Sequence, residues 1–68
     1  MNYPKNEVIA RNLFLSLILD YEYPETDGIP AGVYCRVLND GYYYGFIHAG
    51  SREDAIQKFY KHEITTEV

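Results

Sequence analysis

The chain has 68 residues, one cysteine, no tryptophan and eight tyrosines, and 10 acidic against 6 basic side chains give it a formal net charge of −4. This length predicts a single small domain, residues 1–68, which buries only about 60% of its unfolded surface, so burial against a partner or a second copy is favoured. One cysteine excludes an intrachain disulfide, and the acidic balance argues against a protein that binds nucleic acid directly through its phosphates.

The N-terminal third of the chain allows two structures. Residues 1–6 contain a proline and polar side chains and predict a loosely held arm. Residues 7–23 fit a strand better from Leu13 onward, because alternate positions from there are apolar. The helix-favouring run over residues 7–12 leaves a helix, or a short helical entry, open as the alternative.

Residues 24–32 contain two prolines and two glycines and predict a loop. Together with the end of the preceding strand, this loop carries the densest acidic patch of the chain. Its members are Asp20, Glu22, Glu25 and Asp27. Such a patch either keeps the loop solvated or meets a basic surface on a partner.

Asp40-Gly41 lies between two runs rich in aromatic and β-branched residues, which is a strong signal for a β-hairpin with a two-residue turn. Such a turn pairs Asn39 with Tyr42 and, counting outward, Cys35 with Phe46. Because side chains alternate along a strand, the pairing predicts two faces. One holds Val33, Cys35, Val37, Tyr42, Tyr44, Phe46 and His48, and the other Tyr34, Arg36, Leu38, Tyr43 and Ile47.

Ser51 followed three residues later by Asp54 resembles a capping box and predicts the start of a helix. The apolar residues that recur at helical spacing after it are Ala55, Ile56, Phe59, Tyr60 and Ile64. We expect this stripe to pack on the first hairpin face, that of Val33, Cys35, Val37, Tyr44 and Phe46. The predicted fold is therefore α+β, a three-stranded antiparallel sheet with one C-terminal helix on one face, and residues 65–68 are expected to fray.

No catalytic or metal-binding pattern is present. Neither His48 nor His62 stands at a recognisable spacing from a nucleophile, and with Cys35 they lack the spacing of zinc ligands. No glycine-rich phosphate loop occurs. The sequence therefore predicts a non-enzymatic protein without cofactor or metal. The apolar segment Leu13–Leu19 is too short for a membrane span, and the expected location is cytoplasmic.

The second hairpin face offers an aromatic and aliphatic patch that the N-terminal segment, a protein partner or a second copy could cover. A further alternative, which the acidic balance opposes, is stacking of single-stranded nucleic acid on Tyr34, Tyr43 and Arg36. The expected function is a protein-binding module that occludes its partner's surface, which is basic if the acidic patch imitates nucleic acid. The predicted partner-binding residues are Asp20, Glu22, Glu25, Asp27, Tyr34, Arg36 and Tyr43. In size, acidity and tyrosine content the chain is similar to small phage-encoded inhibitors, such as anti-CRISPR or anti-restriction proteins.

An alternative function comes from the hairpin and helix taken together. Asp40–Tyr43, followed by a strand and then by Ser51–Ile56, resembles the strand, turn and helix unit of HicB-type antitoxins. This resemblance implies a regulatory protein associated with nucleic acid. Such a protein would need basic side chains on one surface, and the candidates are Arg36, Arg52, Lys58 and Lys61.

Overall fold

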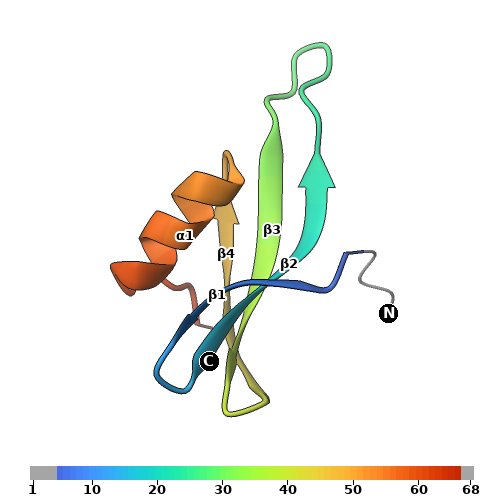
Figure 1. The fold of residues 1–68 in the computed structure, drawn as a ribbon. Helices are drawn as coiled ribbons and strands as arrows, with labels where there is room; N and C mark the ends of the chain where they lie inside the picture. Colours follow the sequence, from blue (N-terminus) through green and yellow to red (C-terminus); the bar gives the residue numbers. More distant parts are fainter. Residues whose placement is uncertain (1–4, 67–68) are drawn as a thin grey trace.

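Residues 5–66 are described by the computed structural model, which contains four strands and one helix. In chain order these are β1 (Glu7–Asn12), β2 (Leu15–Tyr23), β3 (Gly32–Asn39), β4 (Tyr42–Ala49) and α1 (Arg52–Tyr60). Each strand pairs antiparallel with the next, so the sheet is a meander of order β1-β2-β3-β4. Figure 1 shows α1 on one side of this sheet. The α+β class and the C-terminal helix are confirmed, but the sheet has four strands and not three.

The additional strand arises from a turn at Leu13-Phe14, which divides the N-terminal segment into β1 and β2. Asn12 lies opposite Leu15, so only two residues connect the strands, and Leu13 has a φ of 58°. Turns of this length normally use Gly, Asn or Asp where φ is positive. Because Leu-Phe carries no such signal, the sequence did not reveal the turn. The helical alternative for residues 7–23 is wrong.

The β3–β4 hairpin begins as predicted and then changes register. Asp40 and Gly41 have φ of 52° and 87°, and Asn39 lies opposite Tyr42. A bulge at Tyr44 then shifts the pairing by one residue, so that Cys35 lies opposite Ile47 and not Phe46. An extra residue in one strand exchanges the faces of everything beyond it.

The exchange of faces corrects the predicted core. Val33, Cys35 and Val37 face α1 as expected, but Ile47 joins them and Phe46 does not. Phe46 instead stacks on Tyr34 on the opposite face, with ring centroids 5.5 Å apart. His48, paired with Tyr34, moves to that face with Phe46. The core residues are Leu17, Leu19, Val33, Cys35, Val37, Ile47, Ala55 and Phe59.

Helix α1 is capped as predicted and bridges the two edges of the sheet. The backbone N–H of Asp54 donates to Oγ of Ser51 at 3.1 Å. The helix contacts both β4 and β1, the two outer strands, and the Tyr60 hydroxyl donates to the carbonyl of Arg11 at 3.2 Å. The sheet must therefore curve around the helix.

The segment after α1 returns to the outer edge of β4. Phe46 and Thr65 exchange two backbone hydrogen bonds, of 2.8 and 3.0 Å. Gly45 permits this approach, because a Cβ there would lie 2.3 Å from the carbonyl oxygen of Thr65. Of the terminus predicted to fray, residue 65 is thus held by β4, and residues 67–68 lie outside the described part.

The end of the N-terminal arm is also attached to the sheet. The backbone N–H of Lys5 donates to the carbonyl of Asp20 at 3.2 Å, and the Asn6 side chain accepts a hydrogen bond from Arg36. Residues 1–4 of the predicted arm lie outside the described residues.

Candidate interaction surfaces

Asp20 is fully buried, with 0% of its surface exposed, and its carboxylate is held by Arg36. Nε of Arg36 donates to Oδ2 at 2.6 Å and Nη2 donates to Oδ1 at 3.1 Å, while Nη2 also reaches Oδ1 of Asn6 at 2.7 Å. A two-pronged contact of this kind is among the stronger side-chain interactions. The exposed acidic patch therefore excludes Asp20, and two residues predicted to bind a partner bind each other.

Glu22 lies on the surface in a cluster of opposite charges. Arg52, at the start of α1, donates to Glu22 at 3.2 Å and to Glu7 at 3.3 Å, and the Lys5 ammonium lies 3.8 Å from Glu22. The hydrogen bond from Arg52 lowers the pKa of Glu22, and the bond to Glu22 in turn raises the pKa of Arg52. Exposed pairs like these stabilise the fold little. The charge of Glu22 is thus matched within the chain.

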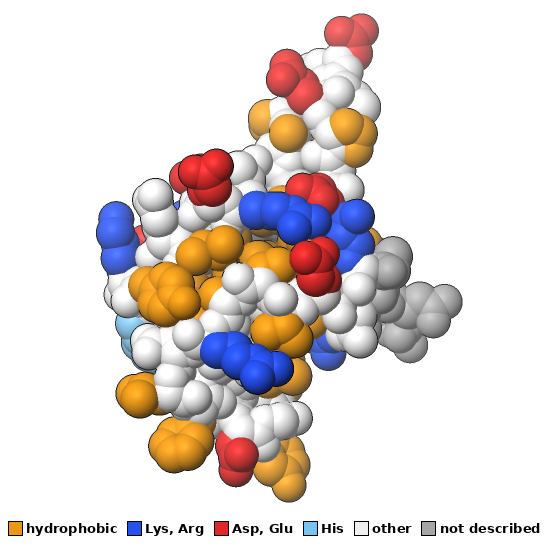
Figure 2. Space-filling model, in the orientation of Figure 1, with side chains coloured by type: hydrophobic (Ala, Val, Ile, Leu, Met, Phe, Trp, Pro, Cys, Tyr) orange, Lys and Arg blue, Asp and Glu red, His pale blue; other side chains and the backbone are white. Residues whose placement is uncertain are grey.

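Glu25 and Asp27 lie on a protruding loop, residues 24–31, which we call the acidic finger. Thr26 and Ile29 exchange two backbone hydrogen bonds of 2.9 Å across a tight turn, in which Gly28 has a φ of 75°. In Figure 1 this loop extends beyond the body of the molecule, and Figure 2 shows acidic side chains at its end. Neither Glu25 nor Asp27 takes part in an ion pair found among residues 5–66. Of the predicted acidic patch, these two charges remain unneutralised.

The face of the sheet opposite α1 carries a row of aromatic rings. Tyr34 lies between Tyr21 and Phe46, with centroid distances of 6.4 and 5.5 Å. Tyr43, 51% exposed, lies opposite Leu38 on the same face. Tyr34, Arg36, Leu38 and Tyr43 thus share this face as predicted, whereas Ile47 belongs to the core because of the bulge.

Sequence reasoning missed the most exposed apolar group among residues 5–66, which lies at the end of the molecule opposite the acidic finger. Leu13 is 93% exposed, Phe14 75% and Tyr42 77%. The N–H of Asp40 donates to the carbonyl of Phe14 at 2.9 Å, so the turns of the two hairpins touch. We call Leu13, Phe14 and Tyr42 the apolar tip; Figure 2 shows hydrophobic side chains projecting from this end. The available signal was a Leu-Phe pair inside an otherwise continuous apolar run, which indicates a turn only once the strands are known.

A hollow of about 260 Å³ adjoins the apolar tip. Leu13, Phe14 and Leu15 line it together with Tyr44 and His62, and two asparagines complete the wall. The Tyr44 hydroxyl lies 3.2 Å from Nε2 of His62. The hollow thus combines apolar walls with a polar pair.

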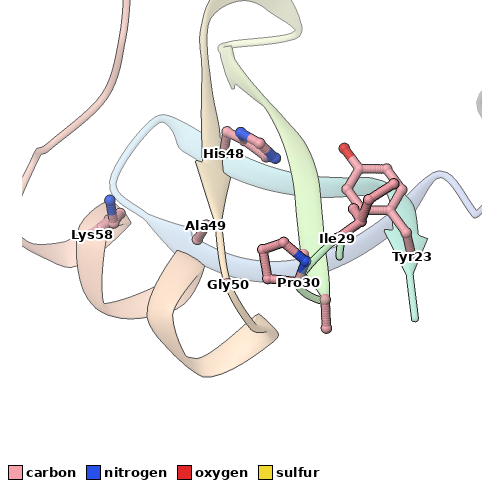
Figure 3. A pocket seen from close by; sticks show the side chains of 9 residues that line it. Tyr23, Ile29, Pro30, His48, Ala49, Gly50 and Lys58 are labelled. Carbon is pink, nitrogen blue, oxygen red and sulfur yellow. The ribbon is translucent and has the colours of Figure 1, made fainter. Parts of the chain in front are cut away.

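A larger and open groove, of about 540 Å³, lies at the base of the acidic finger. Figure 3 shows Tyr23, Ile29 and Pro30 on one side of β4 and Lys58 of α1 on the other. The His48 ring contacts Tyr23 edge to face, with centroids 6.2 Å apart. The polar side chains that line this groove are those of Tyr23, His48 and Lys58. No Asp, Glu, Ser, Thr or Cys is among the lining residues.

The described residues do not assemble a recognisable catalytic or metal site. No group of three or more His, Cys, Asp and Glu side chains within residues 5–66 could hold a metal ion. Over the same residues, the His62 ring is hydrogen-bonded to Tyr44 and the His48 ring contacts Tyr23. Among the described helices none has the length and hydropathy required to cross a membrane.

Cys35 is buried in the core, and this burial raises the pKa of its thiol from an ordinary 9.0 to about 11, with a smaller contribution from Asp20. Between these pH values the unfolded chain releases the proton and the folded chain keeps it, so stability falls as pH rises. We expect the wild type to lose about 2–3 kcal/mol more than Cys35→Ala between pH 8 and pH 11, measured by urea unfolding. Because the two proteins differ only at residue 35, the difference between them reports this thiol; the same pH dependence in both would contradict the prediction.

Comparisons with known proteins give no relative for this chain: no protein-family model, no curated protein and no solved structure matches it. The arguments for function therefore depend on the surfaces described above.

Proposed function

We propose that the chain is a small non-enzymatic protein-binding module whose acidic finger binds a basic surface of a partner protein. The observation that supports this proposal is the position of Glu25 and Asp27. Both are exposed on the protruding loop, and neither is paired with a cation from residues 5–66. Unpaired charge at a protruding point attracts a basic surface and accelerates association.

The shape of the finger suits a partner with a groove. The backbone hydrogen bonds between Thr26 and Ile29 keep the loop narrow, and Ile29 adds an apolar side chain that is 62% exposed. A groove built for nucleic acid offers basic side chains spaced for phosphates. A narrow acidic loop in such a groove would exclude the nucleic acid, which is how an inhibitor of the phage accessory type, anti-CRISPR or anti-restriction-like, would act.

The alternative, an antitoxin-like or regulatory protein associated with nucleic acid, receives less support. Of the four basic residues it requires, Arg36 is bound to Asp20, and Arg52 is bound to Glu7 and Glu22. Because these carboxylates neutralise Arg36 and Arg52, the two arginines do not form a continuous basic surface.

The test is an affinity capture from host lysate with the wild type and with Glu25→Lys/Asp27→Lys, followed by measurement of the dissociation constant for the captured protein. We expect the double variant to bind at least about tenfold more weakly, and the difference to shrink at high salt. Glu22 is left unchanged, because reversing it would also break its contact with Arg52.

A matched control separates the finger from the overall charge. Glu53→Lys/Glu63→Lys changes the net charge by the same amount at two exposed positions outside the finger. This control should bind within about threefold of the wild type. Equal weakening in both double variants, or no weakening in the finger variant, would refute the finger as the contact surface.

A further inference from the structure

The backbone of the Leu13-Phe14 turn is tied to the other hairpin by the Asp40–Phe14 hydrogen bond, but the residue types at this turn break a local rule. Leu13 adopts a positive φ that costs energy for a residue with a bulky side chain, and both side chains remain in solvent. The other hairpin turn of the same molecule, Asp40-Gly41, follows the rule. Departures of this kind are characteristic of functional positions.

The end that carries the turn has a knob and a hollow side by side. The knob is the apolar tip, Leu13, Phe14 and Tyr42, and the hollow of about 260 Å³ lies between Phe14, Tyr44 and His62. A contact between two identical surfaces must be self-complementary, so that each copy provides what the other receives. An apolar centre with polar groups at its margin is also the usual composition of such contacts.

The charges at this end do not oppose the approach of a second copy. The formally charged side chains in the segments that form it are Arg11, Asp40, Lys61 and Glu63, and their charges cancel. The opposite end displays the unpaired acidic groups of the finger. A chain with a net charge of −4 repels a second copy overall, and the cancelled charges at the apolar tip reduce that repulsion there.

We propose that the apolar tip is a homodimer contact, in which the Leu13-Phe14 turn of each copy enters the hollow of the other. The proposal does not rest on the function of the finger, which lies at the other end. The molecule measures 27 × 24 Å across its long axis. An ellipse with these axes has an area of roughly 500 Å², so an end-to-end contact buries on the order of 500 Å² on each copy, close to the lower limit of about 1,000 Å² in total for a specific interface. The dimer should be weak, and a dimer would carry its two acidic fingers at opposite ends.

Sedimentation equilibrium over about 10 μM to 1 mM tests the proposal. The average mass of the wild type should rise with concentration from 7.9 kDa toward twice that value. In Leu13→Gly/Phe14→Asn the turn receives the residues that a two-residue hairpin with a positive first φ prefers. This variant should fold at least as well as the wild type by circular dichroism, and its dimerisation should weaken at least about tenfold.

The control is Ile29→Ser, which removes an exposed apolar side chain from the finger and should dimerise as the wild type does. A wild type that stays monomeric throughout, including one that binds phospholipid vesicles through the same turn instead, overturns the proposal. Undiminished dimerisation of Leu13→Gly/Phe14→Asn overturns it as well. Neither result bears on the finger, because loss of partner capture is measured with different variants.

Discussion

Asp20→Ala is expected to lower the free energy of unfolding by about 3–5 kcal/mol, because it leaves the Arg36 guanidinium largely buried without its carboxylate. A domain of this length is stabilised by only about 3–10 kcal/mol in total, so the variant should lose a large part of its stability. Urea unfolding followed by circular dichroism measures the loss.

A double variant identifies the cause of that loss. Asp20→Leu/Arg36→Met removes both charges and keeps apolar volume, a replacement that is often nearly neutral for a buried pair. It should recover most of the stability that Asp20→Ala loses. If the double variant is as unstable as the single one, then packing at Asp20, and not the unpaired charge, accounts for the effect.

Phe59→Ala is expected to cost about 3–5 kcal/mol, because the ring is the largest side chain that α1 contributes to the core and is almost wholly buried. Its loss leaves a cavity where the helix meets the curved sheet. Tyr60→Ala, one residue further on an exposed position, is the matched control and should cost less than about 1.5 kcal/mol, mainly for the hydrogen bond to Arg11. Thermal unfolding of both variants gives the comparison, and a similar loss in the two would show that α1 is not anchored by Phe59.

The parts of the fold that follow from local chemistry could be predicted from the sequence. The Asp40-Gly41 turn and the Ser51 cap each require particular residue types, and both are present where the structure uses them. The bulge at Tyr44 could not be predicted, because no local residue type marks it; next to it Gly45 lies against Thr65, a residue beyond the helix. This one extra residue in β4 exchanges the faces of the hairpin on which Phe46 and Ile47 were expected to lie.

The surface residues also divide into those whose exposure follows from the local sequence and those whose exposure depends on contacts with distant residues. Glu25 and Asp27 were predictable as exposed charges, because prolines and glycines surround them. The burial of Asp20 was not, since it depends on Arg36, sixteen positions away in a neighbouring strand. The sequence predicts a strand from Leu13 onward, because nothing in the chemistry of Leu13 and Phe14 separates a buried residue from one at an exposed turn.

The meander order of the strands has a consequence for how the chain folds. Every strand pairs with its neighbour in sequence, so most of the sheet can form by successive closure of short loops, each with a small entropic cost. Among residues 5–66, the contacts of α1 join the last part of the chain to the first strand, through Tyr60 with Arg11 and through Arg52 with Glu7. Folding should therefore be fast for a sheet protein, with the helix joining the first strand to the last as the closing step.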